Sequence, residues 1–176
     1  LQEKKEPASI DDISRALASI YAGIFLIDLV HDNYVIIKSS KEIASMLEQI
    51  ESAQQAINVA IQRTVSTDEL SDVQAFMNLA SLPERMKTEK CLNIDYEGMV
   101  SGWVKGSFIE MKRDNTGKLE QILYTYQTIN KEKRKELENL QQLKDDYART
   151  EKDNEAAKEA FAREKVVLED RNTLLT

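Results

Sequence analysis

LEQILYTYQTINKEKRKELENL, from Leu119 to Leu140, joins two different patterns with no proline or glycine between them. The first half, up to Asn130, alternates apolar and polar residues and is rich in Ile, Tyr and Thr, which is typical of a half-buried strand. The second half consists mainly of Lys, Arg, Glu and Leu, which is typical of a solvated helix. A strand that continues directly into a charged helix can pass a movement of a sheet to whatever follows. The junction therefore favours signalling over chemistry.

Composition divides the chain at the same place. Residues 1–130 have the apolar content of a globular domain, whereas half of residues 131–176 are charged, and this second part cannot bury a core by itself. We therefore expect a charged lead-in linker over residues 1–9, a folded domain over residues 10–130 and an exit helix over residues 131–176.

Charge and composition exclude several classes of partner. The net charge of −7 argues against a nucleic-acid binder, and the short basic cluster Lys131–Lys135 is interrupted by Glu132. Cys91 is the single cysteine, so an intrachain disulfide is excluded and a reducing, cytoplasmic location is expected. No apolar run approaches the roughly 20 residues needed to span a bilayer, so we expect no membrane contact by this segment. Because the chain begins at Leu1 rather than Met, we expect it to be part of a longer protein, and a membrane anchor in that parent stays open.

The periodicity along the chain predicts the order of its elements. Ser9 and Asp12 have the spacing of a capping box at the start of a helix, the stretch Ser66–Glu69 offers a capped start for another, and Pro83 is expected to interrupt a helix. The expected elements are a helix over 10–21, strands over 23–30 and 33–40, a helical middle over 41–88, and strands over 91–98, 101–113 and 119–128. This order predicts an α+β fold with one five-stranded antiparallel sheet.

The order and lengths of these elements resemble a PAS domain over about residues 10–130. Three stretches strengthen the resemblance: Ser101-Gly102-Trp103 at the start of the fourth strand, the turn Asp114-Asn115-Thr116-Gly117, and ILYTYQTINKEKRKE from Ile122 to Glu136. The resemblance implies a sensory and dimerisation module of a bacterial signalling protein, such as a diguanylate cyclase or a sensor histidine kinase of a two-component system. The output domain would then follow Thr176.

The end of the last strand departs from the family pattern. PAS domains often end in an Asp-Ile-Thr triplet that pins the sheet to the exit helix, and this chain has Thr128, Ile129 and Asn130 there. The carboxylate is absent, but Thr128 and Asn130 can form hydrogen bonds, and Asn130 can cap the helix. We predict that Gln127, Thr128, Ile129 and Asn130 form the hinge that transfers a signal.

We predict no catalytic, cofactor or metal site. His31 is the single histidine and lies beside Asp32 in an expected turn, where a solvated polar residue is the default; an enzyme that uses this pair as a general base is the least favoured hypothesis. Cys91 has no histidine nearby to activate it, and glycine-rich phosphate loops are absent. The family resemblance adds that flavin and haem are not expected, because neither the flavin-linked cysteine motif nor a histidine within residues 41–88 is present. Any catalysis by the parent would lie beyond Thr176.

The resemblance also implies a small-molecule pocket between the sheet and the helical middle. Residues of suitable type and position are Phe25, Ile27, Met46, Ile57, Phe76, Trp103, Phe108 and Tyr124. Apolar residues at these periods are otherwise packed core, and no convergent polar set identifies a ligand.

The exit helix contains a column of residues at seven-residue spacing, called the seam below: Leu140, Tyr147, Asn154, Phe161, Leu168 and Leu175. The intervening column begins at Leu143 and then becomes polar, so the pattern is that of a marginal parallel coiled coil, with Asn154 able to set its register. We predict a homodimer; the alternative is a solvated connecting helix.

Two functional hypotheses follow. The leading one is a non-catalytic sensory and dimerisation module that couples the state of a ligand or partner, through the last strand and the exit helix, to a downstream output domain. The alternative is a ligand-free structural scaffold that holds two output domains together.

Overall fold

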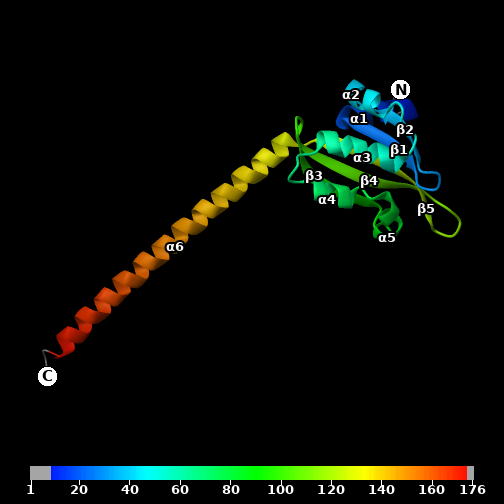
Figure 1. Cartoon of the computed structure of the whole chain (residues 1–176). Helices are drawn as coiled ribbons and strands as arrows, with labels where there is room; N and C mark the ends of the chain where they lie inside the picture. The colour runs from blue at the N-terminus through cyan, green and yellow to red at the C-terminus, as the bar shows by residue number, and fades with distance from the viewer. Residues whose placement is uncertain (1–8, 174–176) are drawn as a thin grey trace, which may run out of the picture. The chain divides into compact units, whose positions relative to one another are not determined.

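The computed structural model describes residues 9–173 (Figure 1). Contacts within the chain divide it into two units, residues 1–130 and residues 131–176, and each is described by itself.

The described residues of the first unit contain one five-stranded antiparallel sheet in the order β2-β1-β5-β4-β3. The last strand of the chain therefore lies in the middle of the sheet, where it joins the N-terminal hairpin to the other two strands. The strands are β1 (Gly23–Asp28), β2 (Asn33–Lys38), β3 (Cys91–Gly98), β4 (Gly102–Arg113) and β5 (Leu119–Thr128). The predicted α+β class with a five-stranded antiparallel sheet is confirmed.

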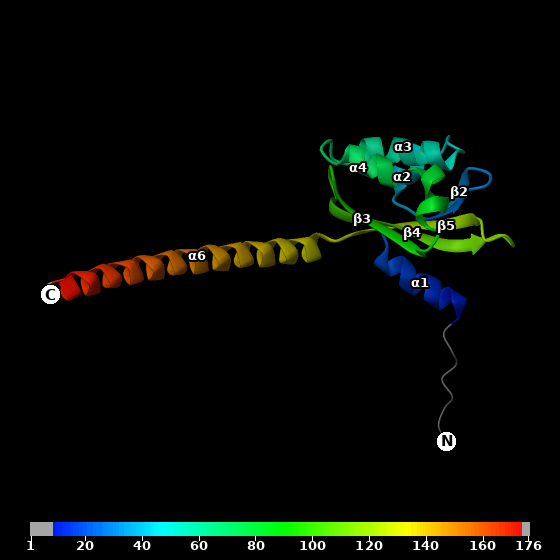
Figure 2. The ribbon, with the colours of Figure 1, turned by 90° about the horizontal axis from the view of Figure 1, so that it is seen from below.

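Short helices cover one face of the sheet, and the first helix lies on the other side (Figure 2). The covering elements are α2 (Lys41–Leu47), α3 (Ala53–Thr64), α4 (Leu70–Phe76), the 3₁₀ turn η1 (Leu79–Ser81) and α5 (Leu82–Arg85). Serine side chains start two of them, because the Ser40 hydroxyl accepts a hydrogen bond from the Ile43 N–H and the Ser52 hydroxyl accepts one from the Gln55 N–H.

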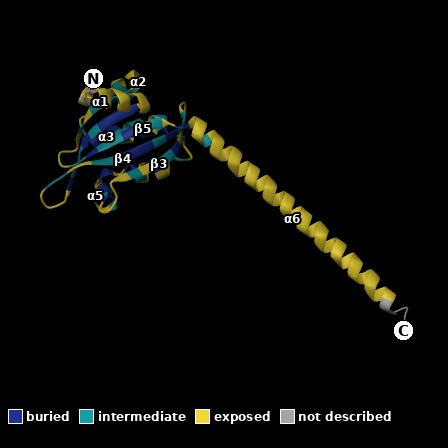
Figure 3. Cartoon of the chain, turned by 180° about the vertical axis from the view of Figure 1, so that it is seen from behind, coloured by how far each residue is buried: buried dark blue, intermediate teal, exposed yellow. Residues whose placement is uncertain are grey.

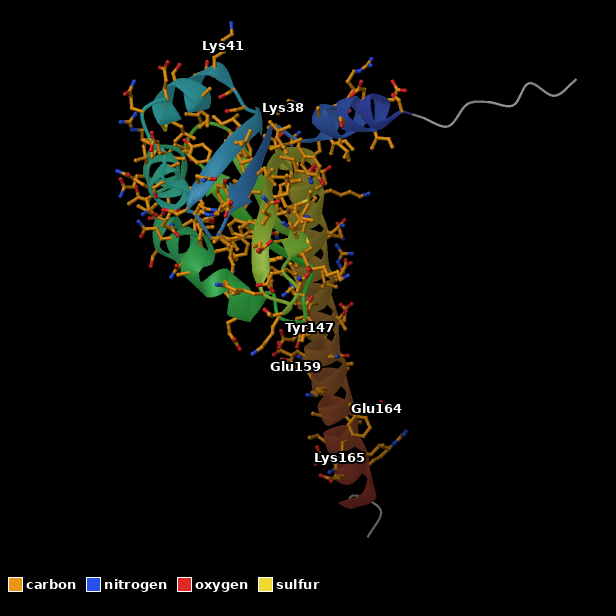
Figure 4. All side chains as sticks on the ribbon, turned by 90° about the vertical axis from the view of Figure 1, so that its right-hand side faces the viewer. Lys38, Lys41, Tyr147, Glu159, Glu164 and Lys165 are labelled. Carbon is orange, nitrogen blue, oxygen red and sulfur yellow. The ribbon has the colours of Figure 1, made fainter. Side chains whose placement is uncertain are left out.

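The first helix, α1 (Ile10–Ile20), begins with the predicted capping box of Ser9 and Asp12. At its other end the Lys38 ammonium, labelled in Figure 4, donates to the carbonyls of Ala18 and Tyr21, the latter at 2.7 Å. A cation at a helix C-terminus satisfies carbonyls that have no partner within the helix. This contact fixes the end of α1 beside β2.

The core lies between the sheet and the covering helices, where buried side chains from both layers meet (Figure 3, dark blue). Phe108, Val73, Leu82 and Met86 are fully buried there.

The structure corrects two expectations about helices, the side-chain cap of α4 and the effect of Pro83. Ser66–Glu69 does not cap α4 through a side chain, because the Glu69 carboxylate accepts a hydrogen bond from the Glu97 N–H at 2.9 Å instead. Pro83 does not interrupt a helix but lies in the first turn of α5, where the missing N–H costs no hydrogen bond.

The second unit is one helix, α6 (Asn130–Thr173), whose first residue belongs to the first unit. Its side chains from 131 to 171 are exposed, except that of Lys133, which is half-buried. Among the described residues, none of the helices has the length and apolar character needed to cross a bilayer.

Candidate functional site

Helix α3 crosses the sheet with its smallest side chains facing the strands. Ala53, Ala56 and Ala60 are spaced three and four residues apart, so their methyl groups lie on one face of the helix. Ala53 and Ala56 are buried although neither fills much volume. The helical layer therefore leaves space above the sheet instead of packing fully against it.

This space is a cavity of about 570 Å³, within the range of roughly 300–1,000 Å³ that is usual for small-molecule sites. Most of its wall is apolar and comes from α2, α3 and all five strands. The inner wall includes Phe25, Ile27, Ile61, Met77 and Val104, whereas the exposed edge is formed by Ser40, Glu42, Arg63, Met99, Val100, Ser101 and Thr128.

Two glycines make room for the tyrosines of the inner wall. A side chain at Gly106 would meet the Tyr124 hydroxyl at 3.0 Å, and one at Gly23 would overlap the Tyr126 ring. Phe25 lies against both rings, with centroid distances of 6.2 Å and 6.3 Å. The floor of the cavity is thus an aromatic surface that exists because its neighbours on the sheet have no side chain.

Burial raises the pKa of the Tyr124 hydroxyl well above the usual value for tyrosine, and it also raises the pKa values of Tyr96 and Tyr126. The neighbouring Tyr96 hydroxyl adds to the increase in the pKa of Tyr124. Tyr34 has a different environment, because its hydroxyl donates to the Ile50 carbonyl at 2.7 Å. The polar groups of the inner wall are therefore neutral phenols.

The predicted pocket residues divide into two groups. Phe25, Ile27, Met46, Ile57 and Tyr124 line the cavity. The other three do not line it: Phe76 stacks on Phe108 at 5.4 Å within the packed core, and Trp103 alternates along β4 with the cavity-lining Val104, which places it on the opposite face of the sheet.

Sequence reasoning missed Tyr96, Met77 and the alanines of α3. The alanine spacing at 53, 56 and 60 was a readable signal, since small residues at helical spacing leave room on one face. No signal marks Tyr96 as part of the cavity, because its neighbours come from other strands.

A second feature of the site is the junction between β5 and α6. The Asn130 side chain accepts a hydrogen bond from the Trp103 N–H at 2.7 Å and donates one to the Ser101 carbonyl at 3.1 Å. The backbone adds a bond from the Ile129 N–H to the Trp103 carbonyl at 2.9 Å. Gly102 has a φ of +71°, and any side chain there would overlap the Asn130 amide. The first residue of α6 is therefore bound directly to the β3–β4 loop.

That loop, residues Met99–Ser101, also lines the edge of the cavity. The Met99 N–H donates to the carbonyl of Thr64, the last residue of α3, at 2.8 Å. The segment Met99–Ser101 therefore lines the cavity, binds the last residue of α3 and binds the residue that begins α6.

Solved structures with low sequence identity are similar to this chain. A sensory box histidine kinase/response regulator from Burkholderia thailandensis E264 aligns over 78% of this chain and 98% of its own, with a TM-score of 0.44 and 14% identity. The N-terminal domain of a diguanylate cyclase with PAS/PAC sensor from Marinobacter aquaeolei aligns over 62% and 96%, with a TM-score of 0.41 and 15% identity. The PAS domain of Bordetella pertussis BvgS aligns over 75% and 98%, with a TM-score of 0.39 and 14% identity.

The architecture of this chain is a five-stranded antiparallel sheet covered on one face by short helices (Figure 2). At these TM-scores and identities, the similarities carry no conclusion about family, ligand or output. No protein-family model matches the sequence, and a search of curated proteins returns no match.

The four predicted hinge residues have different environments. Gln127 pairs with Lys105 within the sheet, Thr128 lies at the exposed edge of the cavity, and Ile129 is buried. Of the four, Asn130 is the one whose side chain binds the β3–β4 loop.

His31 and Asp32, considered as a general-base pair, do not bind each other in the structure. His31 Nδ1 lies 2.9 Å from the carboxylate of Asp28, and this hydrogen bond lowers the pKa of Asp28. Asp32 instead accepts hydrogen bonds from Ser52 and Gln54 at the start of α3. No cluster of three or more His, Cys, Asp or Glu suited to a metal occurs within residues 9–173.

The seam residues lie on α6, in the second unit. Leu140, Tyr147, Phe161 and Leu168 are exposed in the single chain, Tyr147 at 72% and Phe161 at 71%. Asn154 is exposed as well, and Leu175 lies outside the described residues.

Proposed function

We propose that this chain is a non-catalytic sensory and dimerisation module of a signal-transduction protein. A small molecule in the cavity would be the signal, and a downstream output domain such as a diguanylate cyclase or histidine kinase would receive it. The observation that carries the proposal is the double role of Met99–Ser101, which line the cavity and bind Asn130.

In this proposal the loop Met99–Ser101 couples ligand binding in the cavity to α6. A ligand changes a conformational equilibrium only by its difference in affinity between two states. Met99 and Val100 are exposed at the cavity edge, at 54% and 98%, so a ligand that covers them gains apolar contact only when the loop closes over it. Because Ser101 and Trp103 bind Asn130, closure of the loop would shift the first residue of α6.

Dimerisation is proposed to occur through α6. An exposed column of Leu, Tyr and Phe on a helix of 44 residues is stable in water only when another surface covers it. In a parallel dimer the seam of one copy packs against the seam of the other, and the two output domains lie side by side.

The test is a thermal-shift screen of metabolites on the purified chain. We expect at least one compound to raise the melting temperature by several degrees. The variant Ala60→Phe, which fills the cavity from α3, should abolish the shift, whereas Ala16→Phe on the exposed surface of α1 should retain it. A shift that persists in Ala60→Phe would place the ligand elsewhere and contradict the proposal.

The ligand-free scaffold is the competing function, and the exposed seam would serve it equally well. It predicts that no compound stabilises the wild-type chain and that Ala60→Phe leaves signalling of the intact parent unchanged.

A further inference from the structure

The cavity has an uneven distribution of charge. Among the described residues, Glu42 and Arg63 are the charged members of its wall, and both are exposed at its edge. The inner wall contains no ionised group that could pair with a buried charge. Because an unpaired charge is costly to remove from water, a ligand that fills the interior is uncharged along its buried part.

The inner wall has three phenol hydroxyls whose protons have no acceptor among the carbonyls of the described residues. Tyr96, Tyr124 and Tyr126 each bring one hydroxyl proton to this wall. Within residues 9–173 none of these three hydroxyls donates to a carbonyl, whereas the hydroxyl of Tyr34 is already bound to backbone carbonyls.

The surroundings of these phenols prevent the hydroxyls from losing their protons. Tyr96 is 7% exposed, and Tyr124 lies over Gly106 with aromatic rings on both sides. Burial disfavours the phenolate, so each hydroxyl keeps its proton and remains a donor. A donor that faces the cavity without an acceptor in the protein gains a hydrogen bond when a suitable ligand binds.

We propose that the cavity binds an uncharged, mainly apolar molecule whose buried end carries a carbonyl-type hydrogen-bond acceptor for the phenols of Tyr96, Tyr124 and Tyr126. The proposal rests on the sensory function above and names the chemical class of its ligand. Apolar walls supply most of the affinity, and the phenols supply the selectivity.

The experiment compares two probes of nearly equal shape on the full chain by titration calorimetry. Benzophenone has a carbonyl where diphenylmethane has a methylene group. We expect benzophenone to bind about fivefold more tightly, as one neutral hydrogen bond would give. Benzhydrylamine, which carries a positive charge at the same position, should bind at least tenfold more weakly than benzophenone.

Matched variants assign the preference to the phenols. Tyr96→Phe and Tyr124→Phe keep the rings but remove hydroxyls, and we expect the ratio of the two dissociation constants to fall to about one. Tyr147→Phe, the same change at an exposed position of α6 (Figure 4), should retain the wild-type ratio.

The remaining outcomes contradict either the ligand class or the sensory function. Equal affinities in the wild-type chain would reject the acceptor class but leave ligand binding by the cavity intact. A ratio retained in both phenylalanine variants, or tight binding of benzhydrylamine, would also reject it. If neither neutral probe binds, both the ligand class and the sensory function fail. Should the phenylalanine variants not fold, the wild-type ratio alone decides.

Discussion

Asn130 has a side chain that few other residues could replace at the start of α6. Its amide supplies an acceptor for the Trp103 N–H and a donor for the Ser101 carbonyl, and Gly102 provides the space between them. An aspartate could accept the first bond but could not donate the second. A short amide therefore makes the attachment in a chain that has no carboxylate at residues 128–130.

Replacement of this residue tests the junction. Asn130→Ala removes two partly exposed hydrogen bonds, so we expect the free energy of unfolding in urea to fall by about 1 kcal/mol. Asn130 does not line the cavity, so the ligand contacts are retained, and ligand affinity should change only by the free energy that couples the loop to α6. In the intact parent, the output should become insensitive to ligand; an output that still responds normally would show that the signal takes another route.

The buried phenols predict a dependence of stability on pH. Burial raises the pKa values of Tyr96 and Tyr124 in the folded state, so the unfolded chain loses these protons at lower pH than the folded chain does. Their contribution to stability is fully present below about pH 10 and is lost as the pH rises above it.

Urea unfolding between pH 8 and pH 11 measures this effect. The free energy of unfolding should decrease steeply above about pH 10 in the wild-type chain and less steeply in Tyr124→Phe. Tyr147→Phe is the control, since Tyr147 is exposed and its loss should leave the profile unchanged. Identical profiles for all three proteins would contradict the assignment.

At the scale of elements, α3 and α6 each have a helix face that neighbouring side chains do not fully cover. Ala53, Ala56 and Ala60 leave space that other parts of the same domain enclose, which produces a cavity. On α6 the seam residues are large, and the described part of the second unit does not cover them. A small ligand can bind in the space beside α3, and another helix can pack against the seam of α6.

The seam makes a specific prediction about association. Leu140→Glu places a charge in the expected helix interface, so the dimer dissociation constant should rise at least tenfold, whereas Gln141→Glu on the neighbouring position should change it little. Sedimentation equilibrium of the three proteins measures the constants. A wild-type chain that stays monomeric at high concentration would reject dimerisation through α6.

At the scale of the whole molecule, the two units differ in what stabilises them. The first unit has a core of buried side chains between sheet and helices, whereas side chains from residue 134 to residue 171 are exposed. A long helix without tertiary contacts opens readily, because most helical stability in proteins comes from packing.

Amide hydrogen exchange should therefore separate the units. We expect the amides of β4 and β5 to exchange slowest and those of residues 140–171 to exchange quickly in dilute solution. Protection of α6 should rise with protein concentration if two copies pair, while protection of the sheet stays constant. Slow, concentration-independent exchange along α6 would indicate that something within the same chain stabilises it.

The elements of this protein were predictable from sequence because their causes are local. Two-residue periodicity predicted β3 at 91–98 and β5 at 119–128, and the capping box predicted the start of α1, since these signals come from residues within a few positions of one another. The side-chain cap of α4 and the effect of Pro83 were misjudged, because the bond of Glu69 to Glu97 is not local and because a proline suits a first helical turn.

The tertiary structure alone decided the central place of β5, the enclosure of the cavity and the partners of Asn130. Each depends on residues that are far apart in the chain: Tyr96 and Tyr124 line the same cavity, and Ser101 and Asn130 share a hydrogen bond. The sequence by itself determined which segments become strands and helices, because periodicity and capping act over single turns. Which of those segments lie side by side is determined by packing of the whole domain, and the site exists only there.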